Sequence, residues 1–561
     1  MSYEDQSDSD REWLGRAAGW VSAAVIGWAV MAFLSVGVGN FLYILSSYYH
    51  YDIGRYITAL GSVSGVATAL LGLSGKTPAT TDGNHQSWTT FVFGLLLSIA
   101  GPVFVATLIV AASIVLDLLM FGGALLHVLH NPPPTPLTIM LYIVVGIAVA
   151  LAVEIIASKN VNINRFSLHA VYRNRLVRGY LGAARQARFP DQFTGFDEKD
   201  NIRAHTLWPP KASSDERNTF GLFHVLNLSL NVVESKRLAW QERKAEPFTV
   251  SPRHCGSALL GFRPSDEYAD LPSDKSRPRG ITLGTAMAIS GAAVSPNMGY
   301  YSSPSISLLL AFFNVRLGWW LGNPGPWGER SYTKQGPDFA IKPLIDEAFG
   351  LTTDDKPYVY LSDGGHFEDL GLYEMVRRRC RFIVVIDAGG DANFAFDDLG
   401  NAIRKIDIDL GIRIAFTGLR ELRNRPPVGE QQPPYHATAV IDYKAADGDG
   451  SCNGTILYIK PALHWTEPAG IVSYARAHET FPHETTTDQW FTESQFESYR
   501  SLGFEIAKDI LDGKDIPLPG ETEMTLRQLL ANLPETTRAA ESAGSLTQEA
   551  QPAMPHDVVH G

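Results

Sequence analysis

The sequence predicts an N-terminal α-helical transmembrane segment followed by a C-terminal α/β domain whose sheet is mostly parallel. Long apolar runs with almost no charge occupy much of the first third of the 561 residues, whereas the remainder has the mixed composition of a globular domain. Beyond residue 357, short β-rich runs alternate with segments whose apolar residues recur at helical spacing. This alternation is typical of βαβ units, in which the strands are parallel.

Four apolar runs have, or nearly have, the length of a membrane-spanning helix, since about 20 residues cross the hydrocarbon core of a bilayer. They are residues 17–45, 56–73, 91–126 and 137–157. We therefore expect an acidic tail at 1–16, about four transmembrane helices within 17–158, an α/β domain at 159–515 and a largely disordered tail at 516–561. Three spans are the alternative.

The placement of Lys and Arg predicts an orientation. The loop 125–137 carries neither residue, whereas a dense basic flank follows the last apolar run. Its members are Lys159, Arg165, Arg173, Arg175, Arg178 and Arg185. Because positive charge favours the cytoplasmic side, we expect an integral, multi-pass membrane protein with its α/β domain in the cytoplasm. The flank could also contact anionic lipid headgroups, or it could simply be solvated.

Composition excludes several functional classes. The net charge of −12 is spread along the chain, so no clustered basic face suggests a nucleic-acid partner. Cys255, Cys380 and Cys452 lie far apart and form no CxxC pair. We therefore expect neither a disulfide framework nor a metal site, no cofactor, and a reducing compartment. The acidic start lacks the positively charged segment of a secretory signal.

Local patterns predict the elements of the α/β domain in order. A helix is expected around 220–234, and the clearer α/β signals follow it. They are a strand at 358–361, a helix at 370–379, a strand at 382–386, a helix at 397–410, a strand at 412–416, an antiparallel hairpin of 437–443 with 455–460, and a closing amphipathic helix at 492–511.

Asp363 is the candidate catalytic residue. In an open parallel sheet, functional groups gather beyond the carboxyl ends of the strands, and Asp363 follows the strand at 358–361. Gly364 and Gly365 allow a tight turn whose backbone approaches a ligand closely. The carboxylate could accept a proton from a hydroxyl nucleophile, or it could cap the following helix. The residues themselves leave both readings open.

Three segments carry a family resemblance. YVYLSDGGHFEDLGLYEMVRRRCRFIVVIDAG, residues 358–389, resembles the strand–Asp-Gly-Gly–helix–strand that bears the dyad aspartate of patatin-like and cytosolic phospholipase A2-like acyl hydrolases. Residues 280–300 resemble the small-residue helix before that aspartate, and residues 481–503 resemble a segment of large bacterial membrane-anchored members. The resemblance covers most of 160–510. It implies a patatin-like fold with Asp363 as the catalytic aspartate, beside Gly364 and Gly365.

The nucleophile of that family is a serine on a GxSxG elbow, and no such motif precedes Gly280. Gly72-Leu-Ser-Gly-Lys76 matches the G-x-S-G-x form of the cytosolic phospholipases, with Ser74 as the nucleophile. However, Ser74 ends an apolar run, whereas an elbow follows a strand. Ser290, beside Gly291 in a small-residue segment, is more typical of a packing position.

The resemblance therefore implies a membrane-anchored module of a lipid acyl hydrolase that acts on membrane phospholipid. Asp363 would supply the base, and a separately encoded N-terminal half-domain would supply the serine. One alternative is a self-sufficient enzyme that uses Ser74. Another is a non-catalytic membrane scaffold or lipid-binding relative that lacks the nucleophile.

Overall fold

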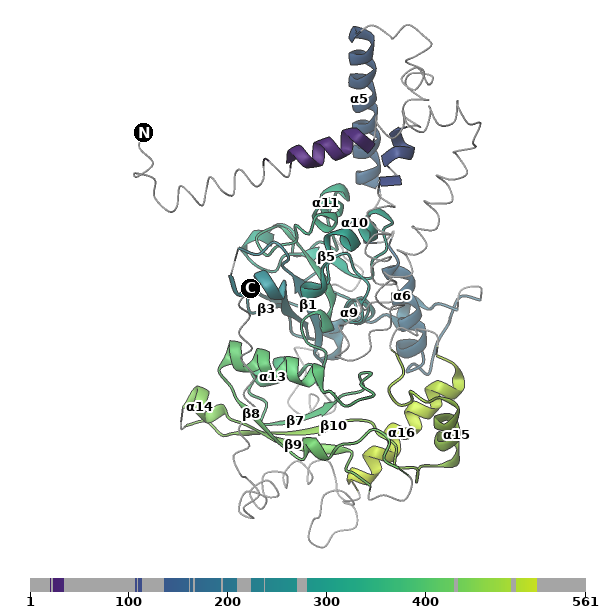
Figure 1. Ribbon diagram of the computed structural model, residues 1–561, viewed down its shortest axis with the longest axis vertical. Helices are drawn as coiled ribbons and strands as arrows, with labels where there is room; N and C mark the ends of the chain where they lie inside the picture. The colour runs from purple at the N-terminus through teal and green to yellow at the C-terminus, as the bar shows by residue number, and fades with distance from the viewer. Residues whose placement is uncertain are drawn as a thin grey trace, which may run out of the picture. The chain divides into compact units, whose positions relative to one another are not determined.

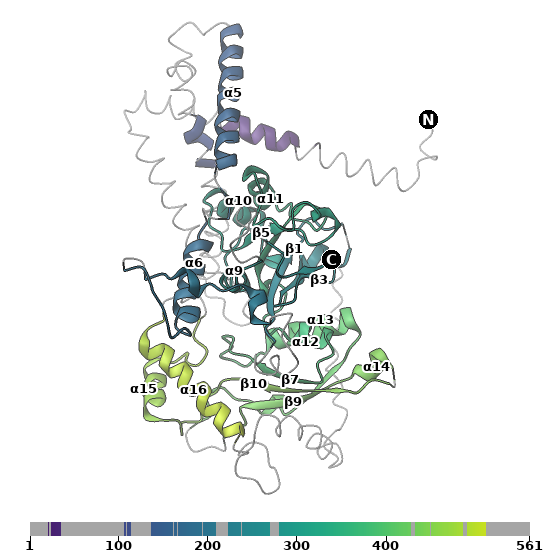
Figure 2. The same cartoon turned by 180° about the vertical axis from the view of Figure 1, so that it is seen from behind.

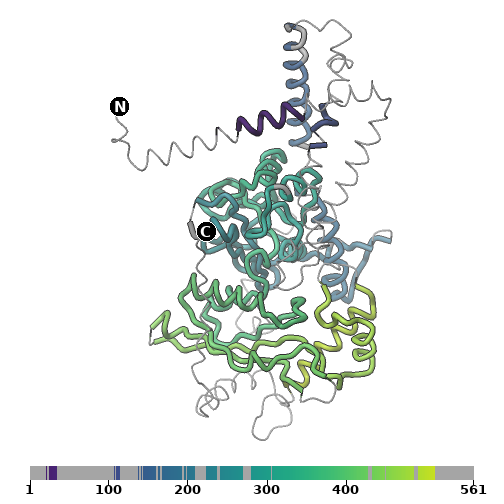
Figure 3. Tube along the Cα trace, in the orientation of Figure 1, coloured from purple at the N-terminus to yellow at the C-terminus, as the bar shows by residue number. Residues whose placement is uncertain are grey.

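The computed structural model divides into two compact units, residues 1–367 and 368–561. It describes residues 136–511 and parts of 21–34 and 106–113, with gaps at 161, 165–166, 193–194, 209–222, 237, 270–279, 428–431, 449 and 486–490. Among the described residues, each unit contains one sheet (Figure 1), and the colours along the chain trace show that each unit is built from its own stretch of the sequence (Figure 3).

The first unit holds a six-stranded sheet in the order β4-β3-β2-β1-β6-β5, and every neighbouring pair is antiparallel. The strands are β1 (Leu226–Asn231), β2 (Ala245–Val250), β3 (His254–Ser257), β4 (Gly261–Pro264), β5 (Trp319–Gly322) and β6 (Tyr358–Asp363). Their apolar side chains form the core of this unit with those of the helix α9 (Leu283–Ser290).

Strand β1 replaces the helix expected at 220–234. Its sequence alternates strictly as Leu-Asn-Leu-Ser-Leu-Asn, and its three leucines are buried in the core. The alternate positions therefore point to the other face of the sheet. A period of two is the signature of a strand, so the alternation within 226–231 was the relevant signal.

Helix α9 begins at a capping threonine and packs on β1 and β6. The hydroxyl of Thr282 accepts a hydrogen bond from the Thr285 N–H at 3.2 Å, which satisfies one free donor of the first turn. Further helices of this unit, among those whose bounds the structure describes, are α5 (Pro136–Asn160), α6 (His169–Leu176), η2 (Val177–Gly182), η3 (Glu198–Asp200), η4 (Ala204–Leu207), α8 (Leu238–Arg243), η5 (Gly299–Tyr301), α10 (Pro304–Phe312), η6 (Pro326–Gly328), α11 (Ile341–Ala348) and η7 (Gly364–His366).

The second unit is built on a four-stranded mixed sheet in the order β7-β10-β9-β8. Strand β7 is parallel to β10, and the other two pairs are antiparallel. The strands are β7 (Phe382–Ile386), β8 (Ile414–Thr417), β9 (His436–Ile441) and β10 (Gly454–Ile459). The helices are α12 (Leu372–Arg377), α13 (Asp397–Leu410), η8 (Leu419–Glu421), α14 (Tyr443–Asp447), α15 (Ala469–Ala477) and α16 (Glu493–Leu511). Helix α13 lies over the sheet, and α15 packs against α16 (Figure 2).

Several elements of the second unit are confirmed, but the mostly parallel patatin-like α/β fold is wrong. The helix at 397–410, the antiparallel pairing of the hairpin strands and the closing helix are present as expected. The βαβ unit is not, because β6 and β7 belong to different sheets and β6 pairs antiparallel with both neighbours. A strand–helix–strand spacing shows that two strands exist, but not that they share a sheet.

The predicted transmembrane segment is also corrected. Among the described residues, no helix combines the length and the apolar composition needed to span a membrane. This finding contradicts the expectation of an integral, multi-pass membrane protein. The run 56–73 lies outside the described residues, and 17–45 and 91–126 are described only in part. The run 137–157 lies within α5, whose large apolar side chains are exposed but whose end is polar, with Glu154 and Lys159.

The C-terminal end of α5 is part of the first unit. Ser158 is buried, and its backbone oxygen accepts the Ala340 N–H at 3.2 Å. Its hydroxyl accepts the N–H of Ile341, the first residue of α11, at 3.1 Å. The last turn of α5 is therefore anchored to α11 by hydrogen bonds, an arrangement that hydropathy does not reveal.

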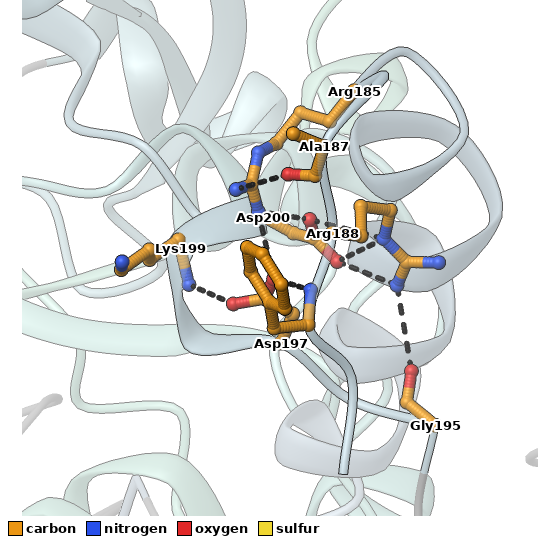
Figure 4. Close-up of polar contacts among 8 residues, drawn as sticks. Arg185, Ala187, Arg188, Gly195, Asp197, Lys199 and Asp200 are labelled. Atoms are coloured by element: carbon orange, nitrogen blue, oxygen red, sulfur yellow. Dashed lines mark hydrogen bonds and ion pairs between the residues drawn. The ribbon is translucent and has the colours of Figure 1, made fainter. Parts of the chain in front are cut away.

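Arg185, one member of the basic flank, and the nearby Arg188 form ion pairs within the protein. Arg185 Nη1 lies 2.6 Å from Asp200 Oδ1 and 3.1 Å from Asp197 Oδ2 (Figure 4). Arg188 Nη2 lies 2.7 Å from Asp200 Oδ2, and Asp200 is 1% exposed. Hydrogen bonds from Arg188 and Arg185 lower the pKa of Asp200. The charge of Arg185 is therefore balanced locally, which favours a structural role over contact with lipid headgroups.

Candidate functional site

Asp363 is the last residue of β6, opposite Leu228 of β1. Its Oδ1 accepts a hydrogen bond from the Gly365 N–H at 2.8 Å, so it caps the short helix η7. Among the described residues, Oδ2 has no hydrogen-bond donor. One oxygen thus fixes the carboxyl group while the other is available to a proton donor. Asp363 can therefore cap η7 through Oδ1 and still accept a proton on Oδ2.

Burial shifts the titration of Asp363. The carboxyl group is partly buried, and desolvation raises its pKa from 3.8 to about 6, against the opposing effect of the Gly365 N–H. A base is most effective when its pKa lies near the working pH, because it is then ionised and can still hold a proton. The environment of Asp363 therefore suits proton transfer near neutral pH.

Gly364 is required by close packing against β1. A Cβ atom at this position would lie 2.7 Å from the Asn227 carbonyl oxygen. The Gly364 carbonyl oxygen in turn accepts a hydrogen bond from the Ser229 hydroxyl at 3.2 Å. Gly364 fixes the turn after β6, and Gly365 supplies the N–H that holds Asp363. Contact of either glycine with a substrate stays a prediction.

Ser290 and Tyr172 lie in the same part of the first unit. The Ser290 hydroxyl, at the end of α9, donates to the Asn227 carbonyl oxygen at 2.7 Å. The next residue, Gly291, leaves room for the Tyr172 hydroxyl, which lies 2.6 Å from the position of a Cβ atom there. Burial, followed by the charge of Asp363, raises the pKa of Tyr172. Tyr172 thus stays a neutral phenol within electrostatic reach of Asp363.

A separate group of hydrogen bonds, on the other face of the sheet, holds the Asp-Gly-Gly turn in place. Ser362 Oγ and His366 Nδ1 lie 2.7 Å apart, and the Asn231 side-chain amide donates to Ser362 Oγ at 2.7 Å. Burial lowers the pKa of His366 to about 4, so its ring is neutral at pH 7. Ser362 is fully buried. This serine–histidine pair therefore holds the Asp-Gly-Gly turn rather than presenting a nucleophile.

The structure brings together some of the residues expected at the site. Asp363, Gly364 and Gly365 occupy one turn, with Ser290 close to Asn227 beside it. Ser74 lies outside the described residues. No group of three or more His, Cys, Asp or Glu side chains in the described part of the chain could hold a metal ion. Cys255, Cys380 and Cys452 are free thiols.

Sequence reasoning missed the polar residues that support the turn. Ser229 and Asn231 come from the polar positions of β1, and Tyr172 comes from α6. The alternation of β1 could have identified the first two residues, because it places them on one face of a strand. No local pattern marks Tyr172. Its place depends on how α6 packs against α9.

Comparisons with protein families and with curated proteins found no match.

Proposed function

We propose that this chain supplies the general base of a serine-dependent lipid acyl hydrolase. Asp363 is the base, Gly364 and Gly365 shape the turn that holds it, and a partner polypeptide provides the nucleophilic serine. The class of substrate, a lipid ester, follows from the resemblance of residues 358–389 to patatin-like and cytosolic phospholipase A2-like enzymes.

In the proposed reaction, the Asp363 carboxylate accepts and then releases a proton in each of two steps, acylation and deacylation of the serine. Ionised Asp363 accepts the hydroxyl proton of the serine while the serine oxygen attacks the ester carbonyl. The proton then passes to the leaving alcohol as the ester bond breaks, which leaves an acyl-serine. Asp363 next accepts a proton from water, whose oxygen attacks the acyl-serine, and the proton returns to the serine when the fatty acid leaves.

The state of Asp363 is the observation that supports this proposal most strongly. Its Oδ1 is held by the Gly365 N–H at 2.8 Å, and burial raises its pKa to about 6. Perturbed carboxyl groups of this kind concentrate at functional sites. Tyr172, whose own pKa is raised by burial and by Asp363, offers a neutral hydroxyl that could orient the carboxylate or a bound ester.

A non-catalytic scaffold is the competing proposal. The capping bond from Asp363 to Gly365 is sufficient to explain why an acidic residue stands at this position. The two proposals differ in what the Asp363→Asn substitution does. Asparagine can still accept the capping hydrogen bond, but it cannot take up the serine proton.

The test combines fluorophosphonate labelling with phospholipid hydrolysis. Purified chain is assayed with and without the product of a neighbouring gene that carries a GxSxG half-domain. We expect hydrolysis only in the mixture, and a loss of 10²- to 10⁴-fold in rate for Asp363→Asn. Full activity of Asp363→Asn in a mixture that hydrolyses phospholipid would overturn the catalytic role.

Ser74→Ala and Ser290→Ala test the rival nucleophiles. Neither substitution should alter labelling or hydrolysis in the mixture if the serine comes from a partner. Labelling of the chain alone that is lost in Ser74→Ala would instead favour a self-sufficient enzyme. Loss in Ser290→Ala, with an unchanged melting temperature, would place the nucleophile at the end of α9.

A further inference from the structure

A surface groove runs between α15 and α16 in the second unit. The two helices pack against each other and lie side by side in both ribbon views (Figures 1 and 2). The groove has a volume of about 730 Å³, and residues 468–505 supply all of its described lining. It is therefore a feature of the second unit alone, distinct from the Asp363 site of the first unit.

The groove has an apolar floor and an exposed aromatic ring at its side. Ile471 and Tyr474 of α15 line it and belong to the core of the unit. Phe504 of α16 also lines it, but its side chain is 60% exposed and stands outside that core. Above Gly470, which lines the groove as well, nothing lies within 4 Å of a Cβ position. The groove therefore offers apolar surface and room for a neighbouring segment, whose burial of the Phe504 ring would be favourable.

The chain itself continues beyond this groove with a suitable segment. Helix α16 ends at Leu511, and residues 512–561 lie outside the described part of the chain. Within them, Leu526, Leu529, Leu530 and Leu533 recur at the i, i+3, i+4, i+7 spacing of one helix face. The intervening residues are mostly good helix formers, and the proline at position 534 would end a helix there.

The dimensions of the groove and of this segment agree. A helix over residues 524–533 would be about 15 Å long, and the part of α16 that lines the groove, residues 494–505, is about 17 Å long. The linker, residues 512–523, reaches up to about 40 Å when extended. The segment can therefore return along α16 in the opposite direction.

We propose that residues 524–533 form an amphipathic helix that docks in the groove of the same chain. Its leucine face covers Ile471, Tyr474 and Phe504, so that three helices pack together at this end of the second unit. A ten-residue helix is marginal by itself, so it forms only when it docks. The tether keeps the segment at a high local concentration, which favours it over a segment of another molecule. The proposal does not depend on the proposed hydrolase activity.

Hydrogen exchange of the full-length chain, measured by mass spectrometry from milliseconds to hours, tests the docking. Light scattering first establishes that the sample is monomeric. The reference is a synthetic peptide of residues 521–536, whose short length disfavours a helix. We expect the amides of 524–533 to exchange at least about tenfold more slowly in the chain than in the peptide, because docking holds them in helical hydrogen bonds.

Two matched pairs of variants locate the contact. Phe504→Ser removes the exposed ring from the groove, whereas Phe496→Ser removes a ring of α16 that is 50% exposed and does not line it. Phe504→Ser should accelerate exchange in 524–533 about 10- to 100-fold, as expected for lost apolar burial, and Phe496→Ser should not. Leu529→Asp on the leucine face should have the same effect, whereas Ala531→Asp on the opposite face should not. Exchange in α15 and β10 shows that each variant remains folded.

Three results would overturn the proposal. The first is exchange of 524–533 at the rate of the peptide in the wild-type chain. The second is an equal effect of the two members of either pair, which would place the segment elsewhere or show a non-specific effect. The third is protection that appears only at concentrations where light scattering detects a dimer. The groove would then hold the segment of a second copy.

Discussion

At the scale of single residues, Asp363 combines a fixed carboxyl group with a pKa near neutrality. The Gly365 N–H fixes one oxygen, and burial at the end of β6 raises the pKa to about 6. The fixed geometry comes from the local turn, but the burial comes from β1 and α9, which lie far away in the sequence. The capping turn around Asp363 was therefore predictable from the local sequence, whereas the raised pKa of its carboxyl group was not.

The raised pKa predicts a pH-dependent stability difference between the wild type and Asp363→Asn. In the unfolded chain the carboxyl group titrates near 3.8, so above pH 6 the folded state carries the cost of a charged, partly buried group. Asp363→Asn removes this cost. At pH 8 the free energy of unfolding of this variant should exceed that of the wild type by up to about 3 kcal/mol, since a shift of one pKa unit is equivalent to about 1.4 kcal/mol. The gain should fall as pH decreases from 6 and vanish near pH 4. Urea unfolding at pH 4, 6 and 8 measures it.

Asp363→Ala is the control for the capping bond. Alanine also lacks the charge, but it cannot accept the Gly365 N–H. It should be less stable than Asp363→Asn by about 1 kcal/mol at every pH. A stability difference between Asp363→Asn and the wild type that stays constant from pH 4 to pH 8 would contradict the raised pKa.

Gly364→Ala should destabilise the first unit. The added Cβ atom would lie 2.7 Å from the Asn227 carbonyl oxygen, which is backbone of the central part of the sheet and cannot move freely. We expect a loss of about 1–3 kcal/mol, as for other overpacked sites. Gly400→Ala in α13 is the contrasting control, because nothing lies within 4 Å of its Cβ position and alanine favours a helix. Equal melting temperatures for the two variants would refute the close approach.

At the scale of elements, a helix or a strand pairing was predictable where its sequence pattern lies within one short segment. The amphipathic pattern of α16 and the hairpin pairing of β9 with β10 are properties of short segments, and both are confirmed. The partners of β6 are not a local property, since its neighbours β1 and β5 come from distant segments. A short apolar run shows that a strand exists, but pairing decides whether the sheet is parallel or antiparallel.

Strand β1 offers a matched pair of substitutions on its polar face. Asn231 donates to Ser362 Oγ at 2.7 Å and accepts the Gly299 N–H at 2.9 Å, in a fully buried position. Asn231→Ala leaves the Gly299 N–H without its acceptor and removes one of the two hydrogen bonds of Ser362 Oγ, which keeps the one with His366 Nδ1. It should cost about 2–4 kcal/mol. The Asn227 Oδ1 is buried without a partner within the described residues, so Asn227→Ala should change stability by less than about 0.5 kcal/mol.

Thermal unfolding of Asn231→Ala and Asn227→Ala, followed by circular dichroism, compares the two positions. Similar losses at both would mean that the strand needs its side chains for packing rather than for these hydrogen bonds. A large loss for Asn227→Ala alone would show that its side chain is satisfied in solution.

At the scale of the whole molecule, the prediction for the N-terminal third rested on composition alone, and the structure describes only parts of that third. Apolar runs predicted four membrane spans, but no described helix meets the requirements for a span. Hydropathy counts residues within a window and ignores tertiary contacts, such as the hydrogen bonds of Ser158 with the start of α11. Nothing in the sequence indicated that the chain divides between residues 367 and 368. This boundary falls inside residues 358–389, which resemble one continuous family motif.

Each of the two units has its own hydrophobic core, and this predicts additive effects of core substitutions. Leu230 is fully buried in the core of the first unit, and Ile506 of α16 is 4% exposed in the core of the second. Leu230→Ala and Ile506→Ala should each cost about 2–5 kcal/mol. Since the two core clusters share no residue, the loss of stability in the double variant should equal the sum of the two single losses within about 0.5 kcal/mol.

Hydrogen exchange measured by mass spectrometry assigns each loss to a unit. Leu230→Ala should accelerate exchange in β1 and β6, and Ile506→Ala should accelerate it in β9 and β10. If either substitution accelerates exchange equally in both sheets, the chain unfolds as one cooperative body and the two cores are not independent.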